Sequence, residues 1–168
     1  MAEFPRPRYR PRRLRRTAAI RALVRETSVD TARLVQPLFV REDPRTETAI
    51  PSMPGIFRLT MDEAASEAEQ LAELGVPAVI LFGLPAEKDP FGQGAYDEHG
   101  VVQEAVRAVK GAAPDVIVMT DVCLCEYTDH GHCGVVRDGR IDDDASLELL
   151  AKTAVSQARA RVDSSAAE

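Results

Sequence analysis

Residues 121–134, DVCLCEYTDHGHCG, are the part of this sequence best suited to hold a metal ion. They contain all three cysteines of the 168-residue chain and two of its three histidines. Cys123 and Cys125 are two positions apart where an apolar run ends, so their side chains should point to the same side of an extended chain. Cys133 returns from a short loop. The three sulfurs are therefore expected to converge on one ion, and zinc is the most available of the soft or borderline metals that thiolates favour.

Three thiolates predict a particular kind of zinc site. Zinc is usually tetrahedral, and three protein ligands leave the fourth position open, as in catalytic rather than structural sites. Gly131 and Gly134 would let the loop reverse sharply. His132 is expected to be a ligand or an outer partner that holds a thiolate through its ring N–H, and His130 to be satisfied within the loop. The alternative is three reduced, buried cysteines without a chemical role and, for Asp121, a strand-end residue that bonds backbone amides.

The elements that must position this loop alternate along the chain. Apolar runs predict strands, and amphipathic periodicity with capping residues predicts helices. The predicted strands are residues 34–40, 78–82 and 116–122. The predicted helices are residues 17–26, 101–112 and 145–160, the last of them capped by Asp144. A further helix is expected between a capping box of Thr60 and Glu63 and its end at Gly75. Leu147, Leu150 and Ala154 are expected on the inner side of the last helix. Because the strands are apolar at nearly every position, both faces of the sheet are expected to be covered.

This alternation predicts right-handed β-α-β units and a parallel sheet. Two architectures fit it, an open doubly wound sheet or part of a (β/α)8 barrel. No Gly-x-Gly-x-x-Gly turn follows a predicted strand, so a dinucleotide-binding fold has little support. In either architecture the loops after the strands form the functional face, and the cysteine-bearing loop is one of them.

Length and composition limit the class of protein. A chain of this length suits one domain, and 45% hydrophobic with 29% charged residues indicates a globular protein. The apolar runs are far shorter than the roughly 18 residues of a membrane span, so no membrane partner is expected. The arginine-rich N-terminus lacks the apolar core of a secretory signal. The expected location is the cytoplasm, where cysteines stay reduced.

Charge separates the N-terminal segment from the rest of the chain. Residues 1–25 carry nine arginines and one glutamate, a net charge of +8, and the whole chain carries −6, so residues 26–168 sum to −14. A basic arm of this kind could bind nucleic acid, remain a solvated tail, or lie on the acidic body of a neighbouring subunit. Residues 5–16 contain one aromatic residue and no recognised nucleic-acid motif, so no nucleic-acid partner is expected. We expect an arm over residues 1–16 and a domain over residues 17–168.

Residues 120–134, TDVCLCEYTDHGHCG, resemble the metal-binding signature of porphobilinogen synthase, also called 5-aminolevulinate dehydratase, in its zinc-dependent, cysteine-rich form. The similarity covers nearly all of residues 6–160. It includes RPRRLRRTAAIRALVRET, LVQPLFV, IPSMPGIFRLT, ILFGLPAEKDPFGQGAY and DDDASLELLAKTAVSQARA. The resemblance implies the first half of a TIM (β/α)8 barrel. It also implies an N-terminal arm that embraces a neighbouring subunit of a homo-oligomer, usually an octamer.

The implied reaction condenses two 5-aminolevulinate molecules to porphobilinogen with loss of water, in heme and other tetrapyrrole biosynthesis. By motif position, Cys123, Cys125 and Cys133 match the zinc ligands, and Asp121 matches an active-site aspartate beside the lysine that forms the Schiff base. Zinc would hold and polarise the second substrate through its open site. A carboxylate at a strand end can shuttle protons. Magnesium is left open as a second metal.

The sequence departs from the family pattern in its lysines. The family's Schiff-base lysines belong to the second half of the barrel, and Lys88, Lys110 and Lys152 do not lie at predicted strand ends. Where the family has a glycine before the next strand, this chain has Arg161. The chain is therefore expected to stop as its fourth strand begins and to be inactive alone. The alternative is a non-catalytic zinc-binding or interaction fragment derived from that enzyme, which clasps full-length subunits with its arm.

Overall fold

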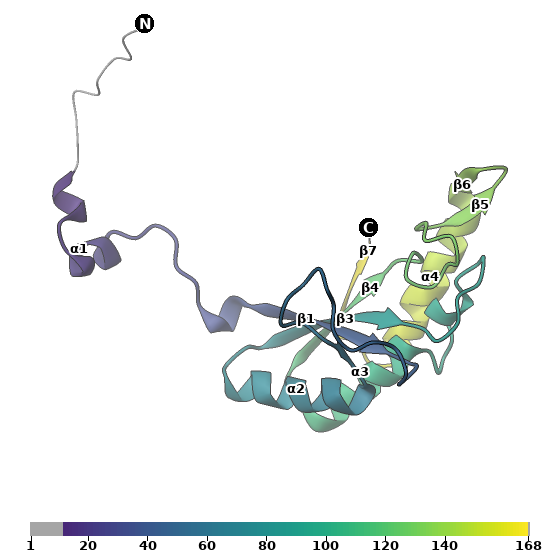
Figure 1. The fold of residues 1–168 in the computed structure, drawn as a ribbon, viewed down its shortest axis with the longest axis horizontal. Helices are drawn as coiled ribbons and strands as arrows, with labels where there is room; N and C mark the ends of the chain where they lie inside the picture. The colour runs from purple at the N-terminus through teal and green to yellow at the C-terminus, as the bar shows by residue number, and fades with distance from the viewer. Residues whose placement is uncertain (1–11, 168) are drawn as a thin grey trace, which may run out of the picture. The chain divides into compact units, whose positions relative to one another are not determined.

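The structure is a computed structural model that describes residues 12–167 of the chain (Figure 1). The chain divides into two compact units, one ending at Asp30 and the other beginning at Thr31. Residues 1–11 of the expected arm lie outside the described residues. The expected boundary after residue 16 stays a prediction.

The first unit contains two short helical segments, η1 (Arg12–Arg15) and α1 (Ala18–Leu23). Thr17 begins α1, because its side chain accepts a hydrogen bond from Ile20 N at 3.1 Å and satisfies one of the free amides of the first turn. Neither segment buries a residue. Leu23, the last residue of α1, is 86% exposed.

The second unit is built on a five-stranded parallel sheet with the strand order β2-β1-β3-β4-β7 (Figure 1). Its strands are β1 (Val35–Arg41), β2 (Arg58–Leu59), β3 (Ala78–Leu84), β4 (Ile117–Val122) and β7 (Ser164–Ala167). The three predicted strands are confirmed as β1, β3 and β4. They are neighbours because a helix after each one returns the chain to the same end of the sheet. The sequence reading missed the two-residue strand β2, and β7 forms where a fourth strand was expected to begin.

Three helices, α2 (Met61–Glu73), α3 (Val101–Ala112) and α4 (Asp143–Arg159), pack against this sheet (Figure 1). The core is made of small and branched side chains, chiefly Ala64, Ala68, Val102, Val106 and Val109 from the helices and Val40, Val79, Leu81 and Val118 from the strands. Burial alternates along β3 and β4, so one face of the sheet is more fully covered than the other. The expected covering of both faces is met on one face, and most residues of β3 and β4 on the other face are half-buried. Among residues 12–167, no helix has both the length and the apolarity needed to cross a membrane.

The last helix differs from the sequence expectation at its start and on its inner face. Asp142, not Asp144, is the N-cap, and its Oδ1 accepts a hydrogen bond from Ala145 N at 3.1 Å. Three consecutive aspartates offered three candidate caps, and only the path of the preceding chain selects among them. The side chains that α4 buries are polar, namely Ser146, Thr153, Ser156 and Gln157, whereas Leu147 is 62% exposed.

The preceding chain is a β-hairpin of β5 (Val135–Arg137) and β6 (Arg140–Asp142), which the sequence reading did not predict. Its two turn residues, Asp138 and Gly139, have φ of 50° and 74°. Asp-Gly is a preferred pair for such two-residue turns, so the signal was present in the sequence. The hairpin brings Asp142 to the helix in an extended conformation suited to capping.

The ends of α2 and α4 adopt the same left-handed conformation with different residues. The predicted capping box of α2 is present, with Glu63 N and Thr60 Oγ1 at 3.3 Å and Thr60 N and Glu63 Oε2 at 2.7 Å. This helix ends at Gly75, which has a φ of 79°. After α4 the equivalent residue is Arg161, with a φ of 76°. A side chain is strained in this region, whereas glycine is not.

Candidate metal centre

The three cysteine sulfurs lie together directly after β4. The Sγ atoms of Cys123 and Cys125 are 3.4 Å apart, and all three Sγ atoms lie within 4.8 Å of one another. Cys123 is buried, Cys125 is half-buried and Cys133 is exposed. Within residues 12–167, no other group of histidine, cysteine or carboxylate side chains has a geometry that could hold a metal ion. We call these three side chains the thiol cluster.

The surroundings of Cys123 and Cys125 oppose loss of their thiol protons. Burial raises the pKa of the Cys123 thiol, and the adjacent sulfurs of Cys125 and Cys133 raise this pKa further. Burial also raises the pKa of Cys125. Metal binding requires the thiolate form. A bound cation would therefore displace the thiol protons and stabilise the negative charges of the resulting thiolates. A soft divalent cation fits this donor set.

Local hydrogen bonds fold the segment that carries the cysteines, residues 123–134, which we call the cysteine loop. Tyr127 N and Thr128 N both donate to Leu124 O, at 3.0 and 2.9 Å. Thr128 Oγ1 donates to the carbonyl of His132 at 2.9 Å, immediately before the third cysteine. Gly131 has a φ of 71°, which supports the expected role of this glycine in the reversal.

A buried network of side-chain amides and hydroxyls, which we call the amide network, fixes the end of β4 where the cysteine loop begins. Thr120 Oγ1 donates to Gln157 Oε1 at 2.7 Å, and Gln157 Nε2 donates to the carbonyl of Asp121 at 2.8 Å. Gln103 Nε2 donates to Ser156 Oγ at 3.0 Å and to a carbonyl of the loop after β3. This network was not predicted from the sequence. Its signal was that Gln157 continues the spacing of Leu150 and Ala154 on one helix face.

The structure does not bring the histidine side chains into the thiol cluster. His130 Nε2 lies 3.3 Å from the carbonyl of Pro90, and His130 Nδ1 accepts a hydrogen bond from His132 N at 3.2 Å. Both ring nitrogens of His130 are therefore satisfied within the loops, as expected. The His132 ring lies against that of His130, with ring centres 5.4 Å apart. Asp121 is half-buried on the face of β4 opposite Thr120.

None of the three lysines of the chain lies on a strand. Lys110 Nζ is 2.5 Å from Asp163 Oδ2 and donates to the Val116 carbonyl at 2.8 Å. Lys152 lies 5.8 Å from the centre of the Tyr96 ring. Lys88 is in the loop after β3. Lys110 and Lys152 are therefore held away from the thiol cluster, by an ion pair and by an aromatic contact respectively.

Residues 8–167 match the family model of delta-aminolevulinic acid dehydratase. The chain belongs to this family. It is 53% identical over 154 residues to delta-aminolevulinic acid dehydratase of Halalkalibacterium halodurans, covering 92% of this chain and 47% of that protein. It is 49% identical over 154 residues to the protein of the same name from Bacillus subtilis, covering 92% of this chain and 48% of that protein.

A solved structure matches the fold as well. Delta-aminolevulinic acid dehydratase (porphobilinogen synthase) from Toxoplasma gondii ME49, in complex with the reaction product porphobilinogen, superposes with a TM-score of 0.88 at 37% identity, over 96% of this chain and 47% of that chain. The predicted family and the predicted fold, part of a TIM barrel, are confirmed. The chain spans about half the length of the curated relatives it matches.

Proposed function

We propose that this chain contributes to a zinc-dependent porphobilinogen synthase, which condenses two 5-aminolevulinate molecules to porphobilinogen with loss of water in tetrapyrrole biosynthesis. Family membership supports this proposal, and so does the porphobilinogen held by the structural relative. The observation that carries the proposal is the convergence of three sulfurs within 4.8 Å at the carboxyl end of β4. In barrels of this kind the active site lies at that end of the strands.

Each of the predicted site residues has a role in this proposal. Cys123, Cys125 and Cys133 would hold the metal. Zinc, when bound, would supply a Lewis acid with one open position for a substrate oxygen or nitrogen. Asp121 would exchange protons with the substrate at its carboxylate. The fixed carbonyl of Asp121, bonded to Gln157, supports this role because it holds the strand end in place.

His132 has a smaller role than a metal ligand in this proposal. Its ring lies outside the thiol cluster, and its carbonyl accepts the bond from Thr128 that closes the cysteine loop. We propose that it acts through the backbone before Cys133. Magnesium as a second metal and the cytoplasmic location stay predictions.

The amine for a Schiff base must come from outside the described residues. No lysine among residues 12–167 lies on a strand, since Lys110 and Lys152 are in helices and Lys88 is in the loop after β3. We therefore expect the 168-residue chain to bind zinc and to form no porphobilinogen alone. The second candidate function is a non-catalytic zinc-binding module that associates with full-length subunits, and the same lysine positions favour it.

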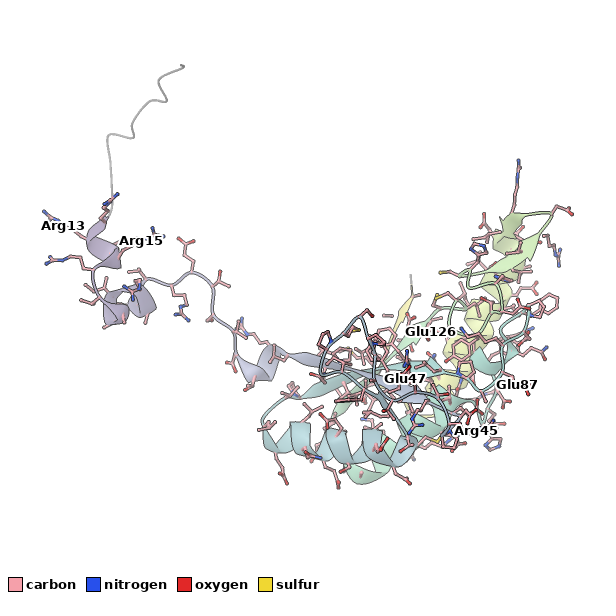
Figure 2. All side chains as sticks on the ribbon, in the orientation of Figure 1. Arg13, Arg15, Arg45, Glu47, Glu87 and Glu126 are labelled. Atoms are coloured by element: carbon pink, nitrogen blue, oxygen red, sulfur yellow. The ribbon has the colours of Figure 1, made fainter. Side chains whose placement is uncertain are left out.

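Association with other subunits is supported by the first unit. Arg13 and Arg15 project from η1 (Figure 2), and Leu14 between them and Leu23 at the end of α1 are exposed. Exposed leucines flanked by arginines suit contact with an acidic, partly apolar surface. The acidic body of a second copy offers such a surface, so we propose a homo-oligomer, as in the octamer that the family resemblance implies.

Calorimetric titration of 5-aminolevulinate into the zinc-loaded chain tests the proposed function. Binding is expected with zinc, and no binding is expected after zinc removal or in Cys133→Ser. The matched control is Asp129→Asn, which changes an exposed side chain of the same loop and should bind like the wild type. Zinc-loaded chain that takes up no 5-aminolevulinate would contradict the proposal. Formation of porphobilinogen by the isolated chain would contradict the expected inactivity.

A further inference from the structure

Tyr127 is buried in the middle of a loop whose tip is exposed. It lies between Cys125 and Cys133, and it is 3% exposed, whereas the loop residues from Asp129 to Cys133 are exposed. A loop commonly places its large side chains at the surface or at its base, where they can anchor it. The position of Tyr127 suggests an anchor for the part of the cysteine loop that carries the third sulfur.

Three glycines line the slot that holds the Tyr127 ring. Gly83 belongs to β3, and Gly92 and Gly94 belong to the loop that follows it. A Cβ atom on these residues would lie 2.7 Å from the Tyr127 hydroxyl, 3.2 Å from its Cβ and 3.3 Å from its Cδ1, respectively. Such distances are shorter than ordinary carbon contacts, so the ring occupies space that exists because these three residues lack side chains.

The glycine-bearing loop is itself held in one conformation, and it is bonded to the cysteine loop. The Asp89 carboxylate accepts hydrogen bonds from Phe91 N at 2.8 Å and from Gln93 N at 2.7 Å. The backbone of Asp89 donates to the carbonyl of Tyr127 and accepts from Asp129 N, both at 3.2 Å. The loop after β3 therefore forms a fixed base on which the cysteine loop rests.

The three sulfurs differ in how they are positioned. Cys123 and Cys125 follow β4 directly, so the strand places them. Cys133 is eight residues further along and exposed, and the loop must bring it back. We propose that Tyr127 is a positioning residue for the metal site, because its ring in the glycine slot fixes the loop that returns Cys133 to the other two sulfurs. This inference rests on the proposed metal-binding function of the thiol cluster.

Cobalt(II) titration of the full chain tests the proposal, since the thiolate-to-cobalt absorption band reports the number of bound thiolates. Tyr127→Leu is expected to weaken cobalt binding about 10–100-fold, as loss of a supporting residue behind a ligand commonly does. The intensity of the thiolate-to-cobalt band of this variant should fall by about one third, because one of the three bound thiolates is lost. Tyr127→Phe keeps the ring and should stay within about threefold of the wild type. Phe91→Leu, which alters a 49% exposed aromatic residue of the base loop, is the matched control and should change neither quantity.

Wild-type affinity and a full band in Tyr127→Leu would overturn the proposal. If the circular dichroism spectrum or the thermal transition shows that Tyr127→Leu is unfolded, the same titration is made with Gly94→Ala. The added Cβ would lie 3.3 Å from Tyr127 Cδ1 and displace the ring by a small amount, so binding several-fold weaker than the wild type is expected. Unchanged binding in this folded variant would likewise count against the proposal.

Arsenite separates failure of this inference from failure of the proposed function. As(OH)3 forms three As–S bonds with three thiols and releases three waters, and it requires that the thiols lie together but not that they bind zinc. Alkylation followed by mass spectrometry should find no free thiol in the wild type and one, Cys133, in Tyr127→Leu. If the wild type binds arsenite but no cobalt or zinc, the metal function is wrong while the positioning role stands. Capture of all three thiols in both proteins would remove the positioning role.

Discussion

Two polar clusters meet at the carboxyl end of β4, and they differ in how their atoms are satisfied. In the amide network, Gln157 is hydrogen-bonded to Thr120 Oγ1 at 2.7 Å and to the Asp121 carbonyl at 2.8 Å. The side chains of Gln157 and Thr120 are fully buried. In the thiol cluster, the Sγ atoms of Cys123 and Cys125 lie 3.4 Å apart, and burial raises the pKa of both thiols. Both polar atoms of the Gln157 amide have partners within the protein, although Gln103 Oε1 in the same network has none among residues 12–167, whereas the thiol cluster offers three sulfur ligands to a cation.

The difference distinguishes a structural cluster from a candidate metal site. Buried amide and hydroxyl groups that pair with one another stabilise the fold and need no ligand. Thiols that converge gain little from one another, since they are weak hydrogen-bond groups, but together they are strong metal ligands. Substitutions in the amide network should therefore reduce stability without reducing metal affinity, and substitutions in the thiol cluster should have the opposite effect.

The largest effect is expected for Cys133→Ser in the thiol cluster. Zinc affinity, measured by competition with a chromophoric chelator, should fall more than about 100-fold, because loss of a ligand exceeds the roughly 10–100-fold cost of losing an outer partner. The free energy of unfolding of the metal-free chain should change by less than about 0.5 kcal/mol, because Cys133 is exposed. A stability loss with retained zinc would reverse the assignment of the two clusters.

Gln157→Leu in the amide network should give the opposite result. The variant removes the Gln157 bonds to Thr120 Oγ1, which keeps only Ser165 Oγ at 3.3 Å, and to the Asp121 carbonyl, and it is expected to lower the free energy of unfolding by about 2–3 kcal/mol. Urea denaturation measures this change, and zinc affinity should stay within about threefold of the wild type. Gln70→Leu on the exposed side of α2 is the control and should change stability by less than about 0.5 kcal/mol. Equal losses in the two variants would show that the network adds no stability.

Asp163→Asn tests a third polar group, which lies near the other end of β4. Burial acts to raise the pKa of Asp163, but hydrogen bonds from Lys110 and from Val118 N outweigh it, so the pKa lies below its usual value. Because the pKa of Asp163 is lower in the folded than in the unfolded protein, its charge stabilises the fold at a pH above the unfolded-state pKa. This stabilisation is lost as the pH falls through the folded-state pKa. Because the side chain is 40% exposed, solvent screens the pair, and we expect a loss of about 1 kcal/mol at neutral pH.

The pH dependence provides the check on that variant. Unfolding free energies of the wild type and of Asp163→Asn should differ at neutral pH and converge as the pH falls below about 4. A difference that stays constant over this range would mean that the effect comes from packing and not from charge.

The smallest effect is expected for Arg161→Gly, at the end of the helix that carries Gln157. Arg161 has a φ of 76°, and Gly75 at the equivalent position after α2 has a φ of 79°. Glycine relieves the strain of the left-handed region, partly offset by its greater freedom in the unfolded chain, so stability should rise by about 0.5–1 kcal/mol. The reciprocal variant Gly75→Ala should lose a similar amount. A gain in the first without a loss in the second would show that the two helix ends are not equivalent.

The helices and strands followed from short patterns because neighbouring residues decide them. The apolar runs of β1, β3 and β4, the Thr60 and Glu63 capping box and the extent of α3 required only local backbone and side-chain preferences. The thiol motif also showed where sulfurs gather, since all three lie within eleven positions. The β5–β6 hairpin was local as well, and its Asp-Gly turn was overlooked.

The sequence by itself determined the family, the parallel sheet and the three candidate ligands, because each depends on residue types at short spacing. Only the tertiary structure decided that α4 buries Gln157 rather than Leu147, that Asp142 caps this helix, and that His132 lies outside the thiol cluster. The physical reason is that these outcomes depend on partners distant in the sequence. Thr120 and Gln157 are 37 residues apart and Gly83 and Tyr127 are 44 apart, and only packing of the complete unit brings them together.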